Sequence, residues 1–294
     1  MSKMDILPEV DSSFLVGEKI SGSEPVAIGK IGVTELRSLY YHRFNVKKDI
    51  RVFNDRIFVN CGVFPSTEKA TKRFLDELCS ALPLMDIMPI YTGIYEFTKQ
   101  HCLPPVTLQY EESLILKYSP ECKFIKLKGL EPYYFNNPWT KYLKNKKVLV
   151  ISPFVDSIKK QYKKRDSIWE DPRILPDFDL ITLKHQLSPA INGRSDFKNW
   201  NDMVESMKES ISKIDFDIAL IGTGASSLPL TAHCKFLGKK AIHLGGSLQV
   251  LFGIKGSRWE DHIIGKNFYN ENWISPSKKE TPKLYKENED GCYW

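Results

Sequence analysis

The chain has 294 residues, enough for one large α/β domain or two small ones, and 42% of them are hydrophobic and 27% charged, as in globular proteins with a substantial core. The net charge of +6 suits an anionic ligand but is too small to indicate nucleic-acid binding. The six cysteines form no C-x-x-C pair, which excludes a zinc ribbon and a thioredoxin-like site, and the chain is too long and too poor in cysteine for a disulfide-stapled scaffold. No apolar run approaches 18 residues and no signal-peptide pattern opens the chain, so we expect a soluble, cytoplasmic protein without a transmembrane segment. Peripheral membrane association and a homo-oligomer stay open.

The N-terminal half contains weaker structural signals than the C-terminal half. Residues 1–24, rich in Ser, Gly and acidic residues, read as a loose lead-in. A buried strand is expected in 25–32, followed by a helix over 33–44. The remaining expected elements are a β-like run over 56–64, a helix over 65–82 with a strong start signal, and a strand and turn within 85–97.

The C-terminal half alternates regularly between apolar, strand-like runs and helical patterns. This alternation predicts a mostly parallel, twisted, Rossmann-like sheet with helices on both faces and right-handed crossovers. We expect one α/β domain over 25–274, with halves 25–145 and 146–274, and a C-terminal tail over 275–294 that packs on the body. The strands are expected at 146–154, 177–185, 215–224 and 239–246, and the helices at 156–169, 197–214, 228–238 and 248–255.

The stretch 217–246 has the parts of a dinucleotide-binding motif but not its pattern. Gly222 and Gly224 follow an apolar run, yet Ser227 stands where the third glycine of G-x-G-x-x-G belongs. His243 stands near the end of the next strand, where an acid would bind the ribose hydroxyls. These two differences disfavour NAD as the ligand. The stretch still has a Gly-rich turn and a helix N-terminus, which together can bind an anion. The alternative is that the two glycines only permit a tight turn.

Three more turns follow strands that should end at this same edge of the sheet. In 29–35, two glycines bring the backbone close to a ligand, and Glu35 stands at a helix start, where it could act as a base or bind a metal. In 152–165, a Ser ends a strand and Arg165 could contact a diphosphate. In 245–259, basic side chains could bind a phosphate and Trp259 could stack on a base or sugar; the alternative is a solvated loop around a core tryptophan.

These segments resemble the GT-D class of glycosyltransferases. In that class a first strand leads into an R-[FY]-G-D-G-E-like segment, over which Lys30-Ile-Gly-Val-Thr-Glu35 lies. A later strand–turn–helix–strand unit ends in G-x-x-A-[IV]-[DH]-[IL]-G, over which ALIGTGASSLPLTAHCKFLGKKAIHLGG lies, and Trp259 matches a Trp-containing segment. The resemblance covers roughly residues 25–260. The chain also resembles proteins encoded among polysaccharide-synthesis genes that carry an LFGIKGSRW-type run.

The resemblance implies a glycosyltransferase that moves a sugar from a nucleotide-diphosphate donor, foremost a UDP-sugar, to a glycan or polysaccharide acceptor. Val33 replaces the Asp of the class's metal-binding acidic pair, so only Glu35 is left to hold Mg²⁺ or Mn²⁺ together with the nucleotide-sugar. Glu35 is the first choice for the base and His243 the second. The alternatives are a non-catalytic nucleotide- or sugar-binding protein and a nicotinamide or flavin oxidoreductase. The residues expected to bind the nucleotide-sugar are Lys30, Gly32, Ser152, Arg165, Gly222, Thr223, Gly224, Ser226, Gly245, Gly246, Lys255, Arg258 and Trp259.

Overall fold

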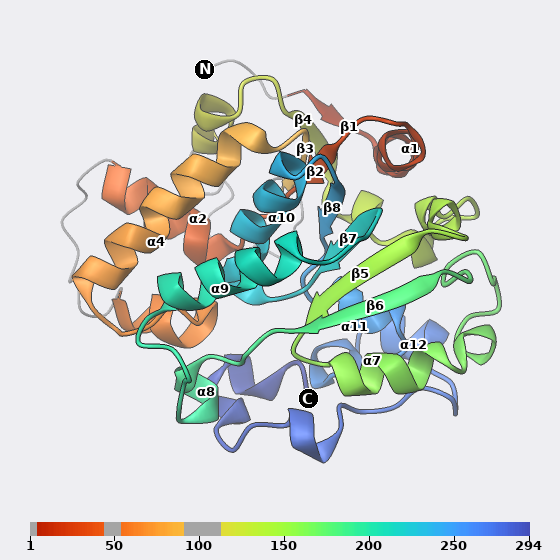
Figure 1. The fold of residues 1–294 in the computed structure, drawn as a ribbon. Helices are drawn as coiled ribbons and strands as arrows, with labels where there is room; N and C mark the ends of the chain where they lie inside the picture. The colour runs from red at the N-terminus through yellow and green to blue at the C-terminus, as the bar shows by residue number, and fades with distance from the viewer. Residues whose placement is uncertain (1–4, 44–53, 91–112) are drawn as a thin grey trace.

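The computed structural model describes residues 5–43, 54–90 and 113–294 and contains one sheet of eight strands (Figure 1). Every strand pair is parallel, and the strand order is β1-β4-β3-β2-β8-β7-β5-β6. The predicted α/β class with a mostly parallel sheet is therefore confirmed. The strands are β1 (Ile6–Leu7), β2 (Val26–Ile28), β3 (Ile87–Ile90), β4 (Lys123–Lys126), β5 (Lys147–Ser152), β6 (Asp179–Lys184), β7 (Ile218–Ile221) and β8 (Lys240–His243).

Helices cover both faces of the sheet, and each face has its own hydrophobic core (Figure 1). Side chains alternate along a strand, so β5 sends Leu149 and Ile151 to one core and Val148 and Val150 to the other. The first core, with Leu149, lies under α2 (Val33–Arg43), α4 (Glu68–Ala81), α9 (Trp200–Ser212) and α10 (Ser227–Phe236). The second lies under α1 (Glu9–Ser21), α7 (Val155–Tyr162), α11 (Ser247–Leu251) and α12 (Ile263–Phe268), while the short α8 (Pro189–Asn192) lies outside both.

Two predictions for the N-terminal half are wrong. Residues 6–21 are not a loose lead-in, because β1 extends the sheet beside β4 and α1 buries Val16 and Ile20 in the second core. The run 56–64 is not a strand: Ile57–Cys61 forms a π-helical turn that ends at Gly62. A short apolar run fits a buried strand or a buried helical turn equally well, and here its apolar side chains pack into the first core beside α2. Part of the strand and turn expected within 85–97 lies outside the described residues.

The C-terminal segment is fastened to the body through a buried carboxylate. Glu280 is 2% exposed and accepts hydrogen bonds from the backbone N–H groups of Asp156 (2.8 Å) and Ser157 (3.2 Å) at the start of α7. The hydroxyls of Ser157 and Ser277 also donate to it. The indole of Trp294 donates to the Glu280 carbonyl (2.9 Å) and its ring packs edge-on against Phe154. No helix of the described residues combines the length and apolar character needed to cross a membrane.

We expect Glu280→Ala to lower the free energy of unfolding by about 3 kcal/mol, because it leaves two backbone N–H groups and two hydroxyls without their acceptor. Urea unfolding followed by tryptophan fluorescence measures the change. Glu287→Ala removes an exposed carboxylate from the same segment and should change the value by less than about 0.5 kcal/mol. Equal losses for the two variants would show that the Glu280 hydrogen bonds do not anchor the segment.

Candidate functional site

The site lies where the chain leaves two neighbouring central strands toward opposite faces of the sheet. β2 and β8 pair in register from Val26↔Lys240 to Ile28↔Ile242. After β2 the chain enters α2 over the first core, whereas after β8 it enters α11 over the second. Such a divergence opens a crevice at the carboxyl ends of the strands, which is the usual ligand site of an open parallel sheet.

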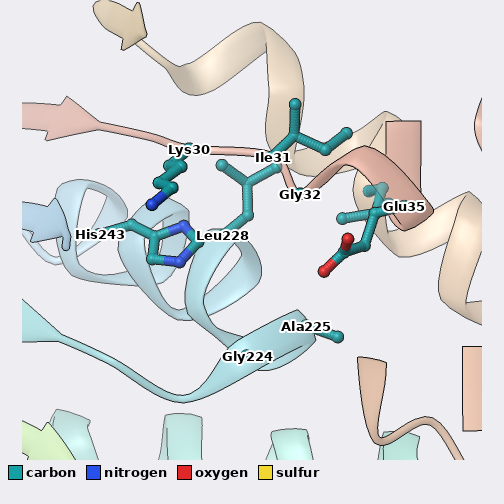
Figure 2. A pocket seen from close by; sticks show the side chains of 9 residues that line it. Lys30, Ile31, Gly32, Glu35, Gly224, Ala225, Leu228 and His243 are labelled. Atoms are coloured by element: carbon teal, nitrogen blue, oxygen red, sulfur yellow. The ribbon is translucent and has the colours of Figure 1, made fainter. Parts of the chain in front are cut away.

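A small pocket occupies this crevice (Figure 2). Figure 2 shows the Lys30 and His243 side chains beside each other, the Glu35 carboxylate facing the same space, and the Gly224–Ala225 turn opposite Lys30. The empty volume, which includes some open solvent, is about 180 Å³. The lining residues are Lys30, Ile31, Gly32, Glu35, Leu78, Gly224, Ala225, Leu228 and His243. Five predicted site residues are thus brought together from turns that are far apart in the sequence.

Lys30 brings an unpaired ammonium group to the pocket. Within the described parts of the chain, Nζ has no hydrogen-bond or ion-pair partner, although Glu131 and Glu35 act on it at longer range. The ammonium lies against Gly245, since a Cβ there would be 3.4 Å from Nζ, and the φ of +59° is what favours glycine at that position. Burial lowers the pKa of Lys30, and the positive charge of Arg258 lowers it further. A partly buried cation without a partner is costly in free energy, which points to an anionic ligand.

Glu35 is held at the start of α2 with its carboxylate bent back over Gly32. A Cβ at Gly32 would collide with that carboxylate, so the glycine makes the conformation accessible. The thiol of Cys61, on the π-helical turn, lies close to Glu35 and acts to lower the pKa of that carboxyl. Burial raises the pKa of Glu35 above its ordinary value, while the contacts with its own backbone N–H, Cys61 and Lys30 act in the opposite direction. A carboxylate with a raised pKa in a pocket has the properties that a general base needs.

His243 ends β8 inside the pocket and is 7% exposed. Its Nδ1 is buried without a hydrogen-bond partner in the described structure. Burial, together with the Lys30 charge, lowers the pKa of His243 to about 3. The imidazole is therefore neutral and a weak base near pH 7, which disfavours the prediction of His243 as a base. Its free Nδ1 can instead accept a hydrogen bond from a ligand hydroxyl.

The 222–227 turn lies opposite Lys30 and leads into α10 (Figure 2). Gly222 is required by close packing, because a Cβ there would lie 2.8 Å from the Gly245 carbonyl oxygen. Gly224 has φ +60° and is exposed at the pocket. The backbone N–H of Thr223 donates to Ser227 Oγ (2.9 Å), whereas the Ser226 hydroxyl is buried without a partner among the described residues. The turn thus directs the positive end of a ten-residue helix toward the pocket.

Glu131 is a buried carboxylate that the sequence did not reveal; it does not line the pocket, but its charge acts on Lys30. It follows the 3₁₀ turn after β4 and accepts a hydrogen bond from Ser247 Oγ (2.6 Å) at the start of α11. Burial raises the pKa of Glu131, and the hydrogen bond from Ser247 and the charge of Lys30 oppose that rise. Glu131 stood in a stretch without a clear secondary-structure pattern, and its only sequence signal was a carboxylate a few residues beyond an apolar run.

Ser152 and Arg165 do not join the pocket. Ser152 is buried at the carboxyl end of β5, where its Oγ accepts from the Phe154 N–H (3.1 Å), and Glu280 already fills the adjoining N-terminus of α7. Arg165 lies beyond the other end of α7 and pairs with Asp177 (3.1 Å), just before β6 begins. The prediction that Arg165 contacts the diphosphate does not fit its place at the opposite edge of the sheet.

The residues predicted in the segment after β8 do not line the pocket. Trp259 is 7% exposed and packs on Gly246 and Tyr293, so it is a core tryptophan and its predicted stacking on a base or sugar does not fit. Gly246 is needed for that packing, because a Cβ there would lie 3.0 Å from the indole. Lys255 places its ammonium 5.4 Å from the centre of the Tyr269 ring. Arg258, beside Trp259, forms an ion pair with Glu289.

The described donor atoms do not fit a metal ion held by the protein. In the described ranges, no group of three or more His, Cys, Asp or Glu side chains is arranged to bind a metal. Glu35 is a single carboxylate, and the neighbouring Lys30 ammonium already supplies positive charge beside it. Mg²⁺ and Mn²⁺ need several oxygen ligands, which Glu35 alone does not provide.

Comparison with known proteins gives structural matches only. No family model matches the chain, and no curated protein matches it. Among solved structures, the chain is similar to a domain described as "the highly conserved domain of unknown function 1792" with "a distinct glycosyltransferase fold", at 13% identity over 91% of this chain and 96% of that one, with a TM-score of 0.38. A selenomethionine-substituted structure of the same domain is 12% identical over 89% of this chain and 98% of that one, also with a TM-score of 0.38.

Proposed function

We propose that the chain is a glycosyltransferase that moves a sugar from a nucleotide-diphosphate donor, foremost a UDP-sugar, to a glycan or polysaccharide acceptor. The observation that carries the proposal is the unpaired Lys30 ammonium, which shares one pocket with the Glu35 carboxylate and the unsatisfied Nδ1 of His243. Each group has a use in the reaction: a cation stabilises the leaving phosphate, a base activates the acceptor, and a neutral imidazole can orient a sugar hydroxyl.

The size of the pocket suggests which part of the donor it holds. Its roughly 180 Å³ of empty space includes open solvent, so the pocket is too small to enclose a whole nucleotide-sugar. We place the reacting end of the donor, the sugar and the phosphate next to it, at this pocket and the rest of the nucleotide outside. That phosphate would lie between Lys30 and the N-terminus of α10, where positive charge meets it from two sides.

The chemistry follows from this placement. The acceptor hydroxyl oxygen forms a bond to the anomeric carbon of the sugar, and the bond from that carbon to the phosphate oxygen breaks. Glu35 takes the hydroxyl proton, and the electron pair leaves with the nucleoside diphosphate. Lys30 and the α10 N-terminus stabilise the negative charge that develops on the leaving oxygen. His243 accepts a hydrogen bond from a sugar hydroxyl and so helps to fix the orientation of the ring.

A panel of UDP-, GDP-, CDP- and TDP-sugars tests the proposal, with and without Mg²⁺ or Mn²⁺. We expect at least one of them to raise the melting temperature and to release nucleoside diphosphate in the presence of an acceptor glycan. If no member of the panel binds or releases nucleotide, the protein is not a nucleotide-sugar transferase. Binding without turnover, together with unchanged function of Glu35→Gln, would indicate the non-catalytic alternative, and bound flavin in an absorbance scan the oxidoreductase.

A further inference from the structure

Arg258 is a second cation at the edge that carries Lys30, and the two differ in their partners. The turn after β8 joins them: Gly245 faces the Lys30 ammonium, and Gly246 packs against Trp259, the neighbour of Arg258. A Cβ at Gly246 would also lie 3.1 Å from the Tyr293 ring, on which the Arg258 guanidinium packs, so the two cations flank the same turn. Lys30 has no ion-pair partner among the residues described, whereas Arg258 is neutralised by Glu289.

The contact between Arg258 and Glu289 belongs to a small cluster built by the C-terminal segment. The Arg258 guanidinium also donates to the Tyr293 hydroxyl (3.3 Å) and lies 4.8 Å from the centre of that ring. Its backbone N–H donates to the Cys292 carbonyl (3.1 Å). The negative charge of Glu289 also acts on Glu35 in the pocket, and it raises the pKa of that carboxyl.

The backbone at Glu289 has an uncommon conformation. Glu289 has φ +47° and Asp290 has φ +56°, and Gly291 follows at +77°. Non-glycine residues adopt this left-handed region rarely and at a cost in free energy, and two in succession are rarer still. Such residues concentrate where a side chain must reach a particular place for function. Here the Glu289 carboxylate reaches the partly exposed guanidinium of Arg258. An ion pair at such a position contributes little free energy by itself.

We propose that Lys30 and Arg258 form a two-point clamp for the two phosphates of a diphosphate group, and that Glu289 occupies the Arg258 end until the ligand binds. The inference rests on the proposed function, which it deepens by assigning the second phosphate to Arg258. In this clamp a diphosphate meets both cations at once, whereas the Glu289 carboxylate meets only Arg258. When the diphosphate binds, Arg258 exchanges the singly charged Glu289 for a more highly charged phosphate. Glu289 is then released from the edge of the pocket.

Inorganic pyrophosphate is the probe, with its dissociation constant measured by calorimetry. Glu289→Gln removes the competing charge with little change in shape and should bind pyrophosphate about fivefold more tightly than the wild type. Asp290→Asn makes the same change in net charge at the neighbouring exposed residue and should leave the affinity within twofold. Weaker or unchanged binding in Glu289→Gln would overturn the clamp, as would no binding of pyrophosphate by either protein.

Hydrogen exchange of the wild type provides a measurement that needs no variant. Saturating pyrophosphate should speed the exchange of backbone amides over 289–294, because Glu289 has left Arg258; unchanged exchange would contradict the clamp. A nucleotide-sugar that turns over, with equal affinity for wild type and Glu289→Gln, would overturn the clamp and leave the proposed function in place. Tighter pyrophosphate binding in Glu289→Gln, with no nucleotide-sugar bound by either protein, would support the clamp and overturn the proposed function.

Discussion

Replacing Lys30 with methionine should remove most of the activity and at the same time leave the fold at least as stable as the wild type. The ammonium has no ion-pair partner among the described residues, and burial together with Arg258 holds its pKa below the ordinary value. A lowered lysine pKa means that folding disfavours the charged form, so the charge costs stability near neutral pH. Methionine keeps most of the apolar stem and removes that cost, and we expect a gain of up to about 1 kcal/mol in the free energy of unfolding.

The activity should change in the opposite direction. Lys30 supplies the charge that meets the leaving phosphate, and loss of one such preorganised group typically lowers the rate by about 100- to 1,000-fold. The measurements are kcat/KM for the nucleotide-sugar identified in the panel and urea unfolding of the same preparations. Lys266→Met, which removes an exposed lysine on α12, should change neither quantity appreciably. A Lys30→Met protein that is markedly less stable, or that is fully active, would show that the ammonium has a structural role.

The fold could be predicted from the sequence wherever an element has a signal in its own residues. The run over 146–154 is apolar and β-branched, as a strand buried on both faces must be, and it forms β5. The helix over 65–82 begins with a capping threonine, and in the structure the Thr67 hydroxyl accepts from Ala70 N–H. The run over 56–64 offered no such signal, because its conformation depends on what it packs against. β1 was missed for the same reason, since two residues become a strand only by pairing with β4.

The residues of the candidate site also divide into those with a signal in their own sequence and those that depend on distant contacts. Lys30, Glu35, Gly224 and His243 were predicted because each follows or ends a strand, and the carboxyl ends of parallel strands meet at one edge. Glu131 could not be predicted, because its hydrogen-bond partner Ser247 is 116 residues away. The protonation state of a residue depends on such distant neighbours too, so a histidine that resembles a base in the sequence is a neutral hydrogen-bond acceptor in the structure.

Glu35→Gln should abolish turnover while leaving donor binding nearly intact. The amide keeps the size of the side chain and still fits beside Gly32, but it cannot accept the acceptor's proton. Loss of a general base typically lowers the rate by about 100- to 10,000-fold. Glu35 contacts the acceptor and not the diphosphate in the proposed arrangement, so the dissociation constant of the nucleoside diphosphate should stay within about threefold of the wild-type value.

The pH dependence of the wild type tests the same assignment. A base must be deprotonated to act, and burial raises the pKa of Glu35, so the rate should fall as the pH drops through a value above the ordinary 4.5 of a glutamate. His243, with a pKa of about 3, should add no step near pH 6.5. Glu68→Gln changes an exposed carboxylate in the first turn of α4 and should keep both the rate and the profile. If Glu35→Gln retained the acidic limb and the wild-type rate, the proton would have to leave through another group, and Glu131, the other carboxylate close enough to act on Lys30, would be tested next.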